Sequence, residues 1–456
     1  TPWAAGAGGV LYMTAPYHLI DFYVRNAFAE TFAFVWIPVV FAGIHKIIYQ
    51  TSTHRYVTLS VGLAGLFLTH LISALYALLF ASLYAAILLM VDAAARMNLR
   101  RLLAPIGRSM LLGSLLVAFF FLPFLEHAIT GKYPPFLEQF RSHFVFSVKL
   151  INALTVDPSD ILATGVSLSR DTIGALGHAH LGPQMPYTLG LHLVALALVG
   201  VATHRRSAAA GASALLAVLT TVMVTPYFNW EWMPTPFHII QFPWRLLVYA
   251  TFFLCVLAAM GLDSVFAVRQ RTVALTLGAM ALGYYLLTAL ATVTPTFVSR
   301  EAMLNADTFS LQGTTGGGEH FPLGYFLRWR AQLPFDASLV TPTATASVSA
   351  RIEAYRRNGS VHTFRVESVE TQAPVTVRLP ALFYLGYRLH DADGRAMPRS
   401  RVTHCDAGLV CATVTAGQYT LRYVATRWAR VGNTLSVIGL IWLAYCALAF
   451  RREQRR

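Results

Sequence analysis

Long apolar runs separated by short polar segments dominate the pattern along this chain. The hydrocarbon core of a bilayer takes about 20 apolar residues of helix, so each run of that length is a candidate transmembrane segment. The candidates are residues 2–16, 30–48, 57–70, 72–92, 109–125, 187–203, 209–227, 246–264, 273–292 and 433–450. The pattern therefore predicts a polytopic α-helical membrane protein with about ten transmembrane segments.

Basic residues gather in the polar segments that lie between these runs. They are Lys46 and Arg55; Arg96, Arg100, Arg101 and Arg108; Arg205 and Arg206; Arg269 and Arg271; and Arg451, Arg452, Arg455 and Arg456. Because basic loops stay in the cytoplasm, a consistent topology has all of these on that side, the C-terminus included. The other face, formed by 17–29, the bend at Thr69-His70, 126–186, 228–245 and 293–432, is then extracytoplasmic. We expect a bacterial inner membrane, with the active face in the periplasm.

The pattern changes after residue 293, where apolar runs give way to alternating β-branched and polar residues. The segments that alternate most clearly are Ser360–Val366, Val375–Leu379, Leu409–Val414 and Tyr419–Val424. This period of two is typical of half-buried antiparallel strands. We predict a transmembrane helical domain over 1–292, an inserted extracytoplasmic β-sandwich-like domain over 293–432, and a final helix with a basic tail over 433–456.

Composition supports the membrane class and removes one alternative. Hydrophobic residues make up 56% of the chain and charged residues only 12%, too little polar surface for a soluble globule of this length. The net charge of +14 lies in loop clusters, so we expect no nucleic-acid partner. Cys405 and Cys411 flank a short turn in the extracytoplasmic segment, where an oxidising compartment favours a disulfide. The chain opens on Thr1-Pro2-Trp3 without an initiator Met, and we expect that an N-terminal portion precedes it.

The first segment with candidate chemistry runs from Pro16 to Glu30. On a helix, Tyr17, His18 and Asp21 project from neighbouring positions, and Asp21 and Arg25 are spaced to form an i, i+4 ion pair. This pattern is typical of an interfacial helix that offers polar groups to a lipid headgroup. An ordinary amphipathic connector with one ion pair explains it equally well.

The second segment runs from Tyr227 to Arg245 and is dense in aromatic and polar residues. It includes Glu231, His238, Gln241, Trp244 and Arg245. An arginine at the start of an apolar helix either extends its charge to the membrane surface or has a partner, and guanidinium binds a phosphate bidentately. We predict that this re-entry loop contributes to a functional site.

The third segment is the bend at Thr69-His70, where polar residues interrupt a long apolar stretch. Polar groups at membrane depth are candidates for function, but His70 also fits a helix cap. Elsewhere, His178 and His180 lack the further ligands of a metal site. No phosphate-binding glycine loop or nucleophile-elbow motif is present.

The motifs at Pro16-Tyr17-His18 to Glu30, at Thr69-His70-Leu71 and at Gln241-Phe242-Pro243-Trp244-Arg245-Leu246 resemble a bacterial family of integral membrane proteins. The family is labelled 6-pyruvoyl-tetrahydropterin-synthase-related and is close in organisation to YfhO-like proteins. Its placement in the GT-C superfamily implies a multi-helix membrane fold, a polyprenyl-phosphate-linked sugar as donor, and transfer to a glycan, lipid or protein acceptor on the external face.

The resemblance also implies site residues. The usual catalytic carboxylate of the superfamily would precede residue 1, and the nearest alternatives here are Asp21, Glu30 and Glu231. We predict catalytic roles for Asp21, His18 and Glu231. The predicted substrate-binding residues are Tyr17, Arg25, His70, His238, Gln241, Trp244 and Arg245, with Arg245 on the donor phosphate. A divalent cation is compatible with the reaction, although no carboxylate cluster marks its site.

Two other classes of protein remain open from the sequence. A lipid-linked saccharide transporter or flippase would place polar residues along several helices at the bilayer midplane, and the runs at 30–48, 109–125, 209–227 and 246–264 contain few. A non-catalytic envelope assembly protein would use the same motifs only to stabilise helix ends.

Overall fold

The computed structural model describes residues 1–130 apart from 24–26, 53, 94–95 and 97–98, and residues 189–266 apart from 226, 235 and 238–242, together with 279 and 283. It also describes residues 343–455 apart from 346–349, 359, 369–373 and 406–408. These residues fall into two compact units. The helical unit draws its described residues from Thr1–Val117, Leu137–Phe297 and Ser436–Arg456, and the β unit from Ala118–Phe136 and Val298–Leu435.

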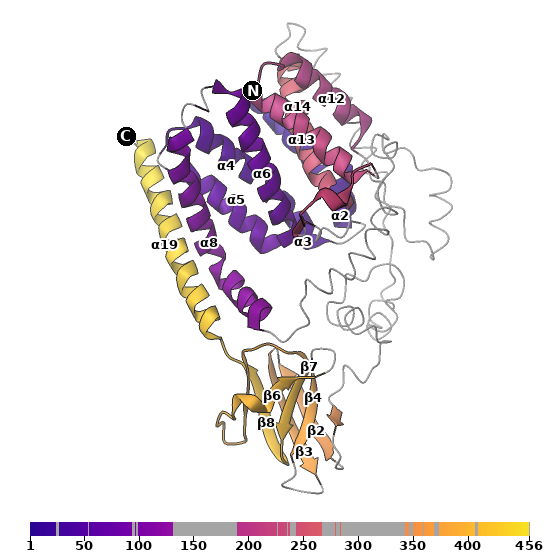
Figure 1. Ribbon diagram of the computed structural model, residues 1–456, viewed down its shortest axis with the longest axis vertical. Helices are drawn as coiled ribbons and strands as arrows, with labels where there is room; N and C mark the ends of the chain where they lie inside the picture. The colour runs from indigo at the N-terminus through magenta and orange to yellow at the C-terminus, as the bar shows by residue number, and fades with distance from the viewer. Residues whose placement is uncertain are drawn as a thin grey trace, which may run out of the picture. The chain divides into compact units, whose positions relative to one another are not determined.

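The helical unit is built from apolar helices that run back and forth (Figure 1). In chain order they are α1 (Pro2–Met13), α2 (Pro16–Tyr23), α3 (Phe28–Phe34), α4 (Trp36–Tyr49), α5 (Tyr56–Thr69), α6 (Leu71–Val91), α8 (Leu99–Thr130), α12 (Leu191–Thr203), α13 (Ala208–Val224), α14 (Leu247–Phe266) and α19 (Arg427–Arg455). Short 3-10 turns, η1 (Trp230–Trp232) and η3 (Pro243–Leu246), connect α13 to α14. Two of the helices, α8 and α19, begin in one unit and end in the other.

Within the described part of the chain, five segments are long and apolar enough to cross a membrane. They are Phe28–Tyr49, Leu71–Val91, Arg101–His127, Pro243–Val265 and Arg427–Phe450. Three shorter apolar helices, Tyr56–Thr69, Leu193–Thr203 and Ala208–Val224, coincide with further predicted spans. By length and composition, these helices are compatible with a membrane protein. The predicted span 2–16 corresponds to the 12-residue helix α1, and 273–292 lies outside the described residues.

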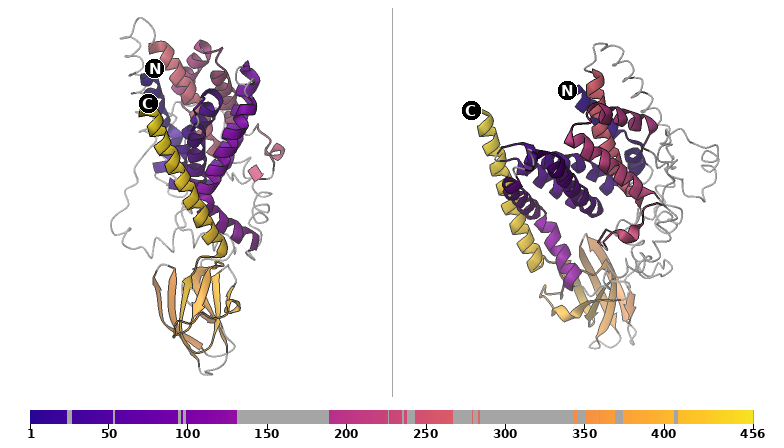
Figure 2. Two further views of the ribbon diagram at one scale, coloured as in Figure 1. Left: turned by 90° about the vertical axis from the view of Figure 1, so that its left-hand side faces the viewer. Right: turned by 45° about the horizontal axis from the view of Figure 1, so that its top comes forward.

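The helices differ in how much of their surface other helices cover. In the apolar window of α14, 78% of the residues are buried, against 17% in that of α19. The outward positions of α19 are apolar: Leu440 is 58% exposed and Ile441 is 65% exposed. Apolar side chains on such a surface need lipid as their solvent. The views in Figure 2 show α19 running beside α8.

Glycine allows the closest helix contact in this unit. A Cβ atom added at Gly200 on α12 would lie 2.0 Å from the carbonyl oxygen of Leu257 on α14, and one at Gly261 would lie 2.6 Å from that of Leu196. Neither distance is compatible with a side chain. Small residues let membrane helices approach to backbone contact, where van der Waals packing replaces the hydrophobic effect.

Helix ends that carry basic residues meet at one end of the helical unit. Tyr49 donates a hydrogen bond to Asp92 over 3.0 Å, which joins the end of α4 to that of α6. Arg55 donates to the carbonyl of Arg101 over 3.1 Å, which joins the starts of α5 and α8. Lys46 donates to the Thr58 hydroxyl over 3.1 Å. The basic loop residues of these segments therefore share one end.

The β unit contains two four-stranded antiparallel sheets. One has the strand order β1 (Thr343–Thr345), β4 (Val375–Leu382), β7 (Leu409–Val414) and β6 (Val402–His404); the other has β2 (Ala350–Asn358), β3 (Val361–Ser368), β8 (Gly417–Tyr423) and β5 (Tyr387–His390). Inward residues of both sheets, such as Phe364, Val377, Val410 and Leu421, form one hydrophobic core. Two sheets over one core make a β-sandwich, and the strands confirm the alternation seen in the sequence.

Two local features close the ends of these strands. The turn after β5 is an Asx turn, in which Asp391 Oδ1 accepts hydrogen bonds from the backbone N–H groups of Asp393 and Arg395. Gly394 supplies the positive φ of 77° that this turn needs. Cys405 and Cys411 are joined by a disulfide with their Cα atoms 5.5 Å apart, which links the end of β6 to β7.

Candidate functional site

A set of buried polar residues lies at the end of the helical unit opposite to the basic residues. It draws on the connection from α1 to α4 and on the entry to α14 (Figure 1). We call it the polar cluster and define it as Tyr17, His18, Asp21, Glu30 and Arg245. Glu30 is 2% exposed and Asp21 is fully buried. Burying a carboxylate is costly unless it has partners, so the contacts of each group matter.

Glu30 uses both carboxylate oxygens within the cluster. Its Oε1 accepts a hydrogen bond of 2.7 Å from the Tyr17 hydroxyl. Its Oε2 lies 3.3 Å from Nε of Arg245, and the two side chains are only 3% and 10% exposed. Glu30 also sits in the first turn of α3, where a negative charge complements the helix dipole. The pair joins the first part of the chain to the start of α14.

Aromatic rings surround this ion pair on the side of η3. The indole of Trp244 is 4% exposed and makes an edge contact with Tyr17, with ring centroids 6.3 Å apart. The guanidinium carbon of Arg245 lies 5.9 Å from the centroid of the Trp244 ring. Rings at this distance exclude water and attract the cation through their quadrupole. The predicted residues Tyr17, Trp244 and Arg245 are therefore in contact.

Asp21 and His18 occupy the same short helix, α2. Asp21 Oδ2 accepts a hydrogen bond of 3.1 Å from the Thr31 hydroxyl on α3. The ring of His18 stacks on Phe34 at 4.3 Å and meets Tyr12 edge-on at 4.4 Å. These polar groups point into the protein, whereas an interfacial helix would present them to the headgroups. The polar groups of α2 are buried because this helix packs against α3. The sequence of α2 alone does not show that another helix covers its polar face.

Burial keeps the imidazole of His18 neutral. Desolvation lowers its pKa from 6.5 to about 3, against a smaller opposite effect from a hydrogen bond to the backbone of Tyr12. Within the described part of the chain, Nε2 of this ring has no hydrogen-bond partner. At neutral pH, His18 can therefore accept a proton or a hydrogen bond but cannot supply a positive charge.

This shift predicts a pH dependence of stability. Between pH 3 and 6.5 the unfolded state carries a proton on His18 that the folded state does not, so the free energy of unfolding rises with pH. Stability is complete above pH 6.5 and falls by about 1.4 kcal/mol for each pH unit below it. Melting curves in detergent from pH 7 to 5 should show this loss, and His18→Phe should remove it. The exposed His404, changed to Phe, is the control and should leave the pH slope unaltered.

The bend at His70 is a helix cap. Nδ1 of His70 accepts the backbone N–H of Ser73 over 3.3 Å and lies 2.8 Å from its hydroxyl oxygen, so His70 is the N-cap of α6. The hydroxyl of Tyr249 on α14 donates to the carbonyl of Ser73, and Tyr249 is within electrostatic reach of Glu30. The bend thus lies beside the polar cluster, and His70 in it caps the N-terminus of α6.

Other predicted site residues are not part of this arrangement. Arg25, His238 and Gln241 lie outside the described residues, so the predicted pairing of Asp21 with Arg25 stays a prediction. Glu231 is exposed on η1, and within the described part of the chain its carboxylate makes no hydrogen bond or ion pair. The described residues also contain no group of three or more His, Cys, Asp or Glu side chains that could hold a metal ion.

No family model, curated protein or solved structure matches this chain. The geometry of the polar cluster is therefore the basis on which its function must be argued. The resemblance described above stays a prediction.

Sequence reasoning missed two contributors to this site. Glu30 stood out only as one of three nearby carboxylates, yet it is the residue that contacts both Tyr17 and Arg245. Thr31 was not among the predicted site residues, but its hydroxyl donates a hydrogen bond to Asp21. The signal available in the sequence was an acidic residue, Glu30, at the start of an apolar run, because a charge at membrane depth requires a partner.

Proposed function

We infer that this chain is a membrane glycosyltransferase of the GT-C type. It would transfer a sugar from a polyprenyl-phosphate donor to a glycan, lipid or protein acceptor of the cell envelope. The observation that carries this proposal is the meeting of three segments distant in the sequence. The motifs at 16–30 and 241–246, on which the family resemblance rests together with that at 69–71, contact each other through Glu30 and Arg245 and through Tyr17 and Trp244. Just after the motif at 69–71, the Ser73 carbonyl accepts a hydrogen bond from Tyr249, which follows the motif at 241–246.

The residues divide into two proposed roles. Asp21, with His18 beside it, forms the wall at which the acceptor hydroxyl loses its proton, by direct transfer or by positioning. The hydroxyl oxygen then attacks the anomeric carbon of the sugar while the bond to the polyprenyl phosphate breaks and the phosphate leaves with the electron pair. Arg245, oriented by Glu30 and Trp244, would stabilise the charge that develops on that phosphate.

The proposed topology follows from the two ends of the helical unit. About ten spans would cross a bacterial inner membrane, with the basic end in the cytoplasm. The polar cluster and the β-sandwich would then face the periplasm, together with the disulfide between Cys405 and Cys411, which an oxidising compartment favours. Support comes from the basic helix ends and the polar cluster lying at opposite ends.

The test is sugar transfer by the full-length protein in nanodiscs, with radiolabelled polyprenyl-phosphate sugars and an envelope lipid fraction as acceptor. Asp21→Asn keeps the size of the side chain and removes the base. We expect transfer to fall by about 100-fold to 10,000-fold, the range of a positioned general base. Asp92→Asn is the matched control, because Asp92 also accepts a hydroxyl hydrogen bond, from Tyr49 at the basic end. It should leave transfer unchanged.

Two results would contradict the proposal. One is wild-type protein that transfers no sugar from any of the donors tested. The other is equal transfer by Asp21→Asn and wild type, with both proteins equally folded by gel filtration and melting temperature.

A specific observation favours the non-catalytic alternative. Glu30 and Arg245 contact each other in a site with little exposure, as expected of a pair that stabilises helix ends in an envelope assembly protein. In that case the donor should neither bind nor be consumed, whereas loss of the pair should still unfold the protein.

A further inference from the structure

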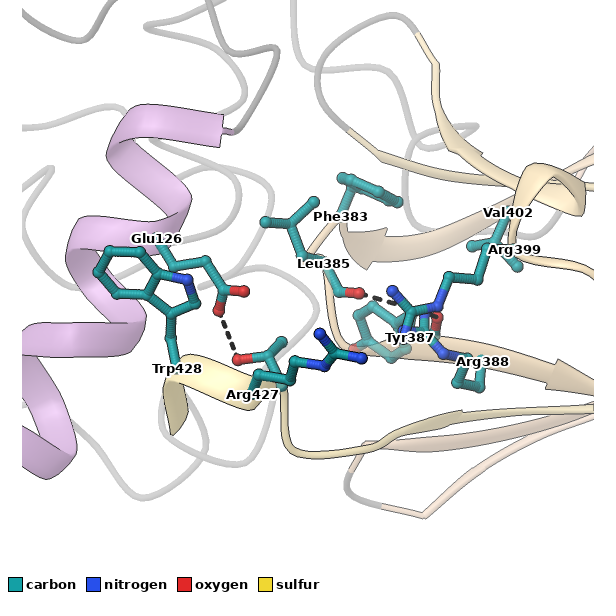
Figure 3. Close-up of a pocket in the computed structure, with 10 residues that line it drawn as sticks. Glu126, Phe383, Leu385, Tyr387, Arg388, Arg399, Val402, Arg427 and Trp428 are labelled. Atoms are coloured by element: carbon teal, nitrogen blue, oxygen red, sulfur yellow. Dashed lines mark hydrogen bonds between the residues drawn. The ribbon is translucent and has the colours of Figure 1, made fainter. Parts of the chain in front are cut away.

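The β unit contains a cavity of about 600 Å³, shown in Figure 3. Its walls come from the last turns of α8, the segment from Phe383 to Val402 and the first turn of α19. The lining residues are Glu126, Phe383, Leu385, Tyr387, Arg388, Arg399, Val402, Thr426, Arg427 and Trp428. It shares no residue with the polar cluster.

Positive charge predominates in this cavity, since its lining holds three arginines and one glutamate. Arg388 is fixed in place, because its Nη1 donates to the carbonyl groups of Leu385 and Tyr387 over 3.2 and 2.8 Å. Burial lowers the pKa of Arg388, and the like charge of Arg399 lowers it further. Two guanidinium groups in one wall give it a positive potential that attracts an anion, and guanidinium binds a phosphate bidentately.

The start of α19 adds to this positive potential. Thr426 is the cap of the helix: its hydroxyl oxygen accepts the backbone N–H of Ala429 over 3.1 Å and donates to the carboxylate of Glu126. Figure 3 shows this bond on the wall opposite Arg388. The N-terminus of a long helix carries a partial positive charge and favours phosphate groups.

Two of the membrane-length segments have an end in the wall of this cavity. Arg427 is the first residue of the membrane-length segment Arg427–Phe450, and Glu126 is in the last turn of Arg101–His127. Trp428 belongs to the class of residues that concentrate at the membrane surface. The ends of helices that cross a bilayer lie among the lipid headgroups.

We propose that the cavity between the end of α8, β5 and the start of α19 binds the phosphate-bearing headgroup of an anionic phospholipid. The guanidinium groups of Arg388, Arg399 and Arg427 contact the phosphate, while Phe383, Tyr387 and Trp428 pack against the glycerol and the first acyl carbons. Free phosphate has the same charge, but the volume is in the range of about 300–1,000 Å³ typical of sites for larger molecules. The proposal does not depend on the glycosyltransferase reaction.

Native mass spectrometry of the full-length protein in detergent tests the proposal. Phosphatidylglycerol, phosphatidylcholine and glycerol 3-phosphate are titrated separately, so that a lipid headgroup and a soluble phosphate ester are distinguished. We expect phosphatidylglycerol to bind at least about tenfold more tightly than either of the others, and Arg388→Gln/Arg399→Gln to remove this preference.

The matched control is Arg351→Gln/Arg365→Gln. These arginines lie on β2 and β3, in the same sheet as Arg388, and their side chains are 83% and 63% exposed. This variant removes the same charge from the same sheet and should bind phosphatidylglycerol like the wild type. Should the pocket variant fail to fold, Arg399→Glu at an exposed position gives the same test by charge reversal.

Three outcomes would overturn the proposal. Equal binding of phosphatidylglycerol and phosphatidylcholine would show that the cavity does not select the negative charge of the headgroup. Glycerol 3-phosphate that binds as tightly as the lipid would assign the cavity to a soluble phosphate ester. Equal losses in the pocket and control variants would show that only overall charge matters.

Discussion

Glu30→Gln is expected to lower the free energy of unfolding by about 3–5 kcal/mol, which is the cost of leaving a buried charge without its counter-ion. Glutamine has the size of glutamate and can still accept a hydrogen bond from Tyr17, so packing changes little. Its amide carries no charge, and the guanidinium of Arg245, with a side chain only 10% exposed, would lose its ion pair with Glu30. Denaturant unfolding of the purified protein in detergent measures this loss.

Glu231→Gln provides the control for this experiment. Glu231 lies on η1, at the same end of the helical unit, but its side chain is exposed. The same chemical change there should alter stability by no more than about 0.5 kcal/mol. A double variant, Glu30→Gln/Arg245→Met, removes both charges and should recover part of the stability. Equal stabilities of Glu30→Gln and Glu231→Gln would refute the importance of this ion pair.

Gly200→Leu should destabilise the helical unit by more than about 3 kcal/mol, beyond the usual range for an overfilled core. A Cβ at this position would come 2.0 Å from the Leu257 carbonyl oxygen. Backbone atoms cannot rotate away as a side chain does, so α12 and α14 must separate along their contact. The melting temperature in detergent and the yield of folded protein measure the effect.

A glycine on the next helix is the matched control. Gly211 in α13 is exposed, and no atom lies within 4 Å of a Cβ built on it. Gly211→Leu should be neutral or slightly stabilising, since leucine favours a helix more than glycine does. If Gly200→Leu and Gly211→Leu have the same melting temperature, the packing of α12 on α14 does not depend on close backbone contact.

Much of the fold could be predicted because it depends on local periodicity. Apolar runs at 72–92 and 433–450 became α6 and α19, since about 20 residues without a charge need lipid around them. The alternation at 409–414 became β7 with the same bounds. In both cases the structure depends on which side chains face lipid, water or the protein core. The order of apolar and polar residues along the chain indicates this directly.

Partners of polar groups were predicted less well. Helical spacing suggested that Asp21 pairs with Arg25, which lies outside the described residues, and it gave no indication of the hydrogen bond that Thr31 on the next helix donates to Asp21. At the Thr69-His70 bend, the sequence left capping and function open, and the geometry of Ser73 corresponds to a cap. The i, i+4 rule applies to isolated helices and does not say which face another helix will cover.

The sequence by itself determined that the chain has helices long and apolar enough to cross a membrane and an antiparallel β region, because hydropathy and alternation are local properties of the chain. Only the tertiary structure decided that Glu30 meets Arg245 and that Gly200 lies against Leu257. It also decided that Arg388, Arg399 and Arg427 line one cavity of the β unit. The physical reason is that a buried charge must find its partner, and a cavity its walls, among residues that packing brings together from distant parts of the chain.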